Sequence, residues 1–147
     1  AGLIGLPGAA GILVARPAGR WMDRAGSVPV VSTGVCVMIA AWLAFGFAAF
    51  SIAFVVLGAI LLDCGLRTAM VANQTLINAA VPESRARANS IFGIHVWGGN
   101  ATGALLTSTA FAMSGWLAVC AICLTASSTA LLIHKGVIPV GRAKRFD

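Results

Sequence analysis

Apolar residues run along this chain in long stretches that only short charged segments interrupt. No Asp, Glu, Lys or Arg occurs from Ala25 to Leu62, and none occurs from Ala88 to His134. A helix needs about 20 mostly apolar residues to cross the hydrocarbon core of a bilayer. Each of these two charge-free stretches is therefore long enough for two membrane-spanning helices and the turn between them.

The breaks in this pattern predict an all-α integral membrane protein with five transmembrane helices. The first segment, Ala1 to about Val14, is short for a full span, and since it does not begin with Met we expect the chain to start inside a helix. Proline and glycine make Arg16 to Pro29 a loop. The other spans are expected at about Val30–Gly46, Ile52–Ala80, Ala86–Phe111 and Trp116–Ile133, joined by Phe47–Ser51, Val81–Arg85 and Met113–Gly115.

Composition supports the membrane class and excludes several others. Of the 147 residues, 59% are hydrophobic and 10% are charged, whereas soluble domains carry about 25% charged residues. The net charge of +6 would also suit a nucleic-acid binder, but the bases stand at the ends of apolar segments, so we expect no nucleic-acid partner. The four cysteines, Cys120-x-x-Cys123 included, lie in apolar runs and are expected to pack as small buried residues, with no metal or other cofactor.

The basic residues predict the direction in which the chain crosses the membrane. Nine of the ten bases fall in the loop near the N-terminus, in the loop after Ala80 with the helix start that follows it, and in the tail from Lys135. These basic segments alternate with two turns that hold no charge, and basic segments face the cytoplasm. We therefore expect a transmembrane domain over residues 1–134 of a multi-pass inner-membrane protein. A basic cytoplasmic tail over residues 135–147 follows it, and the N-terminus faces outward.

Asp63 and Arg67 are the only acid and the only base inside the hydrophobic regions. They are four residues apart on one helix, so they share a face and can pair. Asp63 lies about 18 Å from the outer end of its helix, close to mid-membrane, and Gln74 and Asn78 continue the same stripe. One hypothesis is a substrate or proton site in which Asp63 titrates under the influence of Arg67. The alternative is a permanent ion pair that only locks helix packing.

Two polar residues of the fourth predicted span are further candidates. His95 could relay protons, although a single histidine more often hydrogen-bonds a neighbouring helix, and Asn100 is a similar case. Trp97 either lines the interior or belongs to ordinary core. None of the motifs GxSxG, P-loop and HExxH occurs, so we do not expect an enzyme.

Two loops and one helical segment resemble the major facilitator superfamily. The segment Gly19–Gly26 (GRWMDRAG) resembles the family signature G-x-x-x-D-R-x-G, which joins the second and third helices of a six-helix half on the cytoplasmic side. Val81–Ala88 (VPESRARA) resembles the loop before the eleventh helix, and Gly98–Gly103 (GGNATG) resembles that helix's glycine-rich segment. The family often has two bases after the second glycine, where this chain has Ser27 and Val28.

The resemblance implies that the five spans are helices eight to twelve of a twelve-helix transporter, similar to bacterial drug and sugar efflux permeases. It implies lipid, a small-molecule substrate, a proton as coupling ion and the missing N-terminal half as partners. It also implies that the signature loop gates alternating access, although a solvated loop that only fixes topology is the alternative. The residues expected to act in this gate are Gly19, Asp23, Arg24, Gly26, Glu83 and Arg85.

Within that gate, Asp23 could sit at a facing helix N-terminus, and Arg24 could pair with Glu83. A non-transport membrane component, such as a small helical channel or an assembly subunit, is the competing hypothesis for the whole chain. It predicts that this chain alone is the functional unit.

Overall fold

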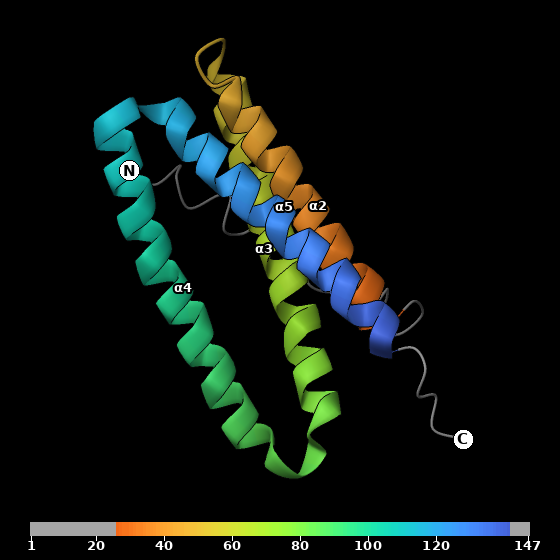
Figure 1. The fold of residues 1–147 in the computed structure, drawn as a ribbon. Coiled ribbons are helices and arrows are strands. Elements are labelled where there is room, and N and C mark those ends of the chain that lie inside the picture. Colours follow the sequence, from red (N-terminus) through yellow and green to blue (C-terminus); the bar gives the residue numbers. More distant parts are fainter. Residues whose placement is uncertain (1–25, 142–147) are drawn as a thin grey trace, which may run out of the picture.

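The computed structural model describes residues 26–141, and its regular structure is entirely helical (Figure 1). The elements are α2 (Ser27–Gly46), α3 (Ile52–Ala80), the short 3-10 helix η2 (Pro82–Ser84), α4 (Arg85–Ser114) and α5 (Trp116–Gly141). The first predicted span and the loop up to Ala25 lie outside the described residues.

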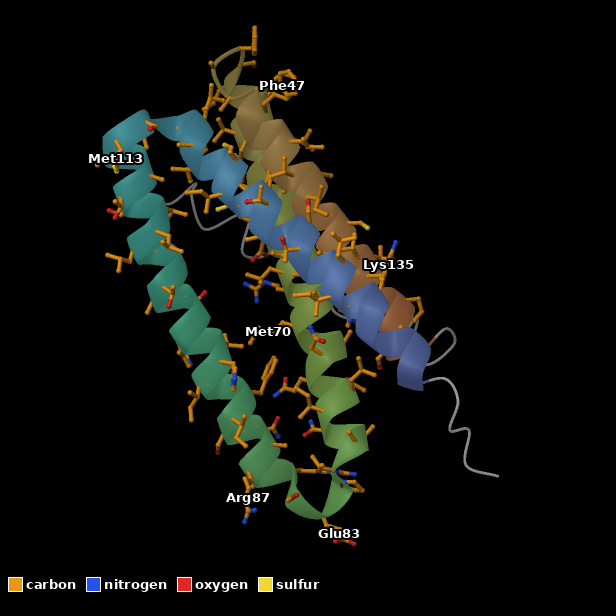
Figure 2. All side chains as sticks on the ribbon, in the orientation of Figure 1. Phe47, Met70, Glu83, Arg87, Met113 and Lys135 are labelled. Carbon is orange, nitrogen blue, oxygen red and sulfur yellow. The ribbon has the colours of Figure 1, made fainter. Side chains whose placement is uncertain are left out.

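Successive helices run in opposite directions, so the turns gather at two ends. Figure 2 places Phe47 and Met113, beside the two uncharged turns, at one end, and Glu83 and Arg87 at the other. The separation of charged from uncharged turns that the sequence predicts is therefore present in the fold. We call these the uncharged end and the charged end.

Local chemistry explains where the helices begin and end. The hydroxyl of Ser51 accepts a hydrogen bond from the backbone N–H of Ala53 at 3.2 Å, which caps the start of α3. Gly115 has φ of 74°, a conformation that favours glycine, and it alone separates α4 from α5. Pro29 was expected to break the chain, but it lies in the first turn of α2, where a helix does not need its N–H.

The tightest packing joins α2 to α3 through small residues. A Cβ atom added to Gly34 would lie 2.8 Å from the carbonyl oxygen of Gly65. Val30, Val31 and Ala72 form the buried core cluster at the same interface. Small residues allow membrane helices to bring their backbones close together, and this contact orients α3 relative to α2.

Helix α5 is tied to α2 near both of its ends. Near the uncharged end, the indole N–H of Trp116 donates to the backbone oxygen of Phe45 at 2.8 Å. Towards the other end of α5, Nε2 of His134 lies 3.1 Å from the backbone oxygen of Val28. Helices α2, α3 and α5 thus form a packed group, which Figure 1 shows as three crossing ribbons.

Helix α4 differs from the span expected at Ala86–Phe111. By length and composition, α2, α3 and Trp116–Gly136 qualify as candidate spans among the described residues, and α4 does not. Its 30 residues are long enough at about 45 Å, but its many glycine, serine and threonine residues make it less apolar. No residue of α4 is buried, and the helix diverges from α3 away from the charged end (Figure 1).

The end of α5 also differs from the prediction. The helix was expected to end near Ile133, but it continues to Gly141. The first residues assigned to the basic tail are therefore helical.

Candidate functional site

Helix α3 carries both of its charged side chains and two of its three amide side chains on one narrow arc. At about 100° per residue, five side chains fall within roughly 80° of one another. They are Asp63, Arg67, Met70, Gln74 and Asn78. Figure 2 places Met70 on the side of α3 that is turned to α4. This polar arc is therefore the face that α3 presents toward α4.

The opposite face of α3 is occupied by α2. The buried residues of α3 are Gly58, Gly65, Ala69 and Ala72, and the same helical geometry centres them about 190° from the polar arc. Gly58 contacts Phe45, and Gly65 contacts Gly34. The small-residue face thus turns the polar arc away from the packed group.

Asp63 and Arg67 form the ion pair that their spacing predicts. Nε of Arg67 donates to both carboxylate oxygens of Asp63, at 3.0 Å each. The arginine side chain is 47% exposed and the aspartate side chain is 23% exposed. Since α3 runs from Ile52 to Ala80, this pair brackets the middle of a helix that is long and apolar enough to cross a membrane.

Gln74 connects α3 to α4. Its side-chain N–H donates to the side-chain oxygen of Asn89 at 3.3 Å. Sequence reasoning missed Asn89, because a polar residue two positions beyond Arg87 and close to a charged loop is unremarkable without the fold. Asn78, the last member of the polar arc, has a buried side-chain oxygen with no hydrogen-bond partner in the described part of the chain.

Asn100 and His95, the two candidate residues on α4, lie on different faces of that helix. Asn100 lies eleven residues after Asn89, about 20° around the helix and so on the same face. Gln74 and Asn89 are in contact, and Asp63 lies eleven residues before Gln74 on α3. Because α3 and α4 run in opposite directions, eleven residues back along α3 and eleven residues forward along α4 lead to about the same height, so Asn100 is roughly level with Asp63. His95 lies about 120° away from Asn89, and its Nδ1 is 2.8 Å from the backbone oxygen of Ile91 in its own helix.

Several polar side chains on the facing arcs of α3 and α4 are exposed in the described part of the chain. Arg67, Met70, Gln74 and Asn100 are all exposed, although they lie on the arcs that face the other helix. Trp97, expected in the interior or the core, is 74% exposed. The two helices therefore meet beside the charged end and leave polar side chains accessible at mid-height.

Only part of the expected gate falls within the described residues. Gly19, Asp23 and Arg24 lie outside them, and so does the expected pair of Arg24 with Glu83. Gly26 has φ of 82°, which suits glycine at the junction between the signature segment and α2. Glu83 and Arg85 are exposed at the start of α4, and neither forms an ion pair within residues 26–141.

The cysteines do not form a metal centre in the described structure. All four are free thiols, with Cys120 buried on α5. Residues 26–141 contain no group of three or more His, Cys, Asp or Glu side chains that could hold a metal ion.

Comparison with known proteins extends these observations to nearly the whole chain. The family model described as Major Facilitator Superfamily matches residues 1–145. The chain is 33% identical over 119 residues to the "Uncharacterized transporter YgaY" of Escherichia coli O157:H7, which covers 81% of this chain and 30% of that protein. It is also 33% identical over 122 residues to the "Probable transporter SCO4007" of Streptomyces coelicolor, which covers 83% of this chain and 28% of that protein.

The chain thus spans less than a third of the length of these curated relatives. No solved structure matches it significantly.

Proposed function

Because the chain belongs to the Major Facilitator Superfamily, a family of membrane transporters and not of enzymes, we propose that it is part of a secondary active transporter for a small organic solute. Its activity then belongs to the full-length transporter that contains these residues, working by alternating access. One observation carries the proposal: a single polar arc at mid-height of α3, turned away from the helix that packs behind it. The match over 1–145 also favours a transporter over a channel or an assembly subunit.

In this proposal the facing arcs of α3 and α4 form one wall of the solute pathway. In transporters built from repeats, substrate binds near mid-membrane between the repeats, and the two halves rock around it. The exposed polar groups on these arcs would meet the solute, and the remainder of the transporter would supply the opposite wall. The Gln74–Asn89 contact closes this wall beside the charged end.

The finer features of the proposal concern coupling, gating and direction. We assign proton coupling to Asp63, the only acid in the predicted spans, and gating to the signature loop together with Glu83 and Arg85. Drug-like or sugar-like solutes and efflux follow the resemblance to bacterial efflux permeases. His95 is the weaker relay candidate, because its ring bonds its own helix and lies off the arc that bears Asn89.

The test of proton coupling replaces Asp63 by asparagine in the full-length transporter. Asn keeps the size of the side chain but carries no charge and takes up no proton, so solute transport should stop or lose its dependence on a pH gradient. The measurement is solute flux into proteoliposomes with and without that gradient. Unchanged flux and unchanged pH dependence would eliminate Asp63 as the coupling group.

A charge exchange tests the alternative in which the pair is only a structural lock. The double variant Asp63→Arg with Arg67→Asp retains an ion pair four residues apart on one helix. A lock would keep working after the exchange, and flux would be retained. Loss of flux with normal membrane insertion would show that each charge is needed at its own position.

A further inference from the structure

Only the Nε edge of the Arg67 guanidinium group is hydrogen-bonded among the described residues. Its Nε–H bonds both oxygens of Asp63 at 3.0 Å. The two terminal nitrogens, which carry four of the five N–H donors of an arginine, have no hydrogen-bond partner among residues 26–141. Among the described residues the end of the guanidinium is therefore available, while its Nε edge is held by the aspartate.

Exposure shows which charge of the pair is presented. The side chain of Arg67 is 47% exposed, about twice the 23% of Asp63. Arg67 also keeps the N–H donors of both terminal nitrogens unbonded among the described residues, so the cation is the more open member of the pair. A ligand that approaches this part of the polar arc meets hydrogen-bond donors and positive charge before it meets the carboxylate.

We propose that Arg67 binds the carboxylate group of the transported solute and that Asp63, in the ionised state in which it pairs with Arg67, positions the guanidinium for it. This inference rests on the proposed transport function and names its substrate class as small organic solutes that carry a carboxylate. The two parallel N–H bonds at the end of a guanidinium match the two oxygens of a carboxylate. Asn100, at about the same height on α4, adds an amide on the facing arc.

The cost of placing a charge at this depth supports an anionic ligand. A charged side chain near mid-membrane is expensive, and such residues are usually paired or functional. The aspartate compensates the charge but leaves most donors of Arg67 unsatisfied by the described residues. A neutral hydroxyl could accept one of these donors, whereas a carboxylate accepts two and carries the opposite charge.

The test measures exchange in proteoliposomes that contain the full-length transporter. Each compound is preloaded unlabelled and its labelled form is added outside, so transport in either direction is detected. The probes are matched pairs that differ at the carboxylate: benzoate with benzamide, hexanoate with hexanamide, and phenylalanine with phenylalaninamide. After subtraction of the exchange that protein-free liposomes show, we expect exchange of at least one carboxylate probe and at least tenfold slower exchange of its amide.

The variant Arg67→Lys separates recognition from folding. Lysine keeps the positive charge and can still pair with Asp63, but it lacks the planar two-pronged donor. We expect exchange of the carboxylate probe to fall about tenfold or more, with normal membrane insertion. The control Arg87→Lys makes the same replacement at an exposed position in the first turn of α4 and should leave exchange unchanged.

The outcomes distinguish this inference from the proposed function. Exchange of amides at rates equal to their carboxylates, or full carboxylate exchange by Arg67→Lys, would overturn the role of Arg67 while transport itself stands. If no probe exchanges, but the transporter moves neutral or cationic solutes, the substrate class is wrong and the function holds. If the full-length protein moves no solute at all, both the function and the inference fail.

Discussion

Gly34 and Gly65 bring the backbones of α2 and α3 into direct contact. A Cβ added to Gly34 would lie 2.8 Å from the carbonyl oxygen of Gly65, and one added to Gly65 would lie 2.7 Å from the carbonyl oxygen of Gly34. Both clashes involve backbone atoms, which cannot rotate away as a flexible side chain can. This contact fixes the face that α3 turns toward α2 and, on the other side, the direction of the polar arc.

Replacing Gly34 by alanine should destabilise the transporter. Overpacking a close interface costs about 1–3 kcal/mol, because the two helices must move apart by enough to accept the methyl group. The measurement is the thermal unfolding midpoint of the purified protein in detergent. Gly93→Ala is the matched control, since a Cβ there meets nothing within 4 Å and alanine favours the helix. Equal midpoints for both variants would contradict the proposed close contact.

Trp116 should stabilise the protein through its indole N–H as well as its ring. The N–H donates to the backbone oxygen of Phe45 at 2.8 Å, and the two rings meet edge to face with centroids 5.9 Å apart. Trp116→Phe removes the donor and keeps an aromatic ring, so a loss of about 1 kcal/mol is expected in urea or thermal unfolding. The control Trp97→Phe changes a side chain that is 74% exposed. A larger loss of stability for Trp97→Phe than for Trp116→Phe would contradict the stabilising role given to the Trp116 N–H.

The apolar pattern predicted α3 well because its hydrophobic stretch ends at the same residues as the local start and stop signals of the helix. The predicted and observed bounds, Ile52–Ala80, are identical. A serine cap precedes the helix, and Pro82 in the charged loop follows it, so hydropathy and local chemistry agree. Pro29 misled the prediction because proline has two roles, as a helix breaker in the interior and as a good residue in the first turn.

The candidate site was only half readable from the sequence. The Asp63–Arg67 pair follows from spacing on one helix, because i and i+4 positions always share a face. The Gln74–Asn89 contact joins two helices. The periodicity of α3 alone cannot show which residue of α4 meets Gln74, or at what height along the helices they meet. The same limit applies to His95 and Asn100. Only after Asn89 shows which face of α4 is turned to α3 does it become clear that Asn100 lies on that face and His95 does not.

The Gln74–Asn89 hydrogen bond should couple α3 to α4 energetically. Gln74→Ala and Asn89→Ala are each expected to destabilise the transporter, and the double variant should lose less than the sum of the two. Coupling of about 0.5–1.5 kcal/mol is expected for a hydrogen bond of this kind. The measurement is a double-mutant cycle in thermal unfolding. The control cycle pairs Gln74→Ala with Asn100→Ala, which lies far along α4, and additive losses in the first cycle would exclude the coupling.

The charged end should face the cytoplasm and the uncharged end the outside. The expectation comes from the basic residues of the loop after Ala80 and of the tail from Lys135, and the fold gathers the loop residues Glu83 and Arg87 at one end (Figure 2). Two single-cysteine variants probe it, Ala49→Cys in the uncharged turn and Ser84→Cys in η2, both at exposed positions. Each is made in full-length transporter whose native cysteines have been replaced.

A membrane-impermeant maleimide then reports the side of each turn. In intact cells it should label Ala49→Cys and not Ser84→Cys, and in inverted membrane vesicles it should label Ser84→Cys and not Ala49→Cys. The reverse pattern would invert the topology and place the signature loop outside, where it could not act as a cytoplasmic gate. Labelling of both variants from one side would mean that α3 does not cross the membrane, and the mid-membrane position of Asp63 and Arg67 would be wrong.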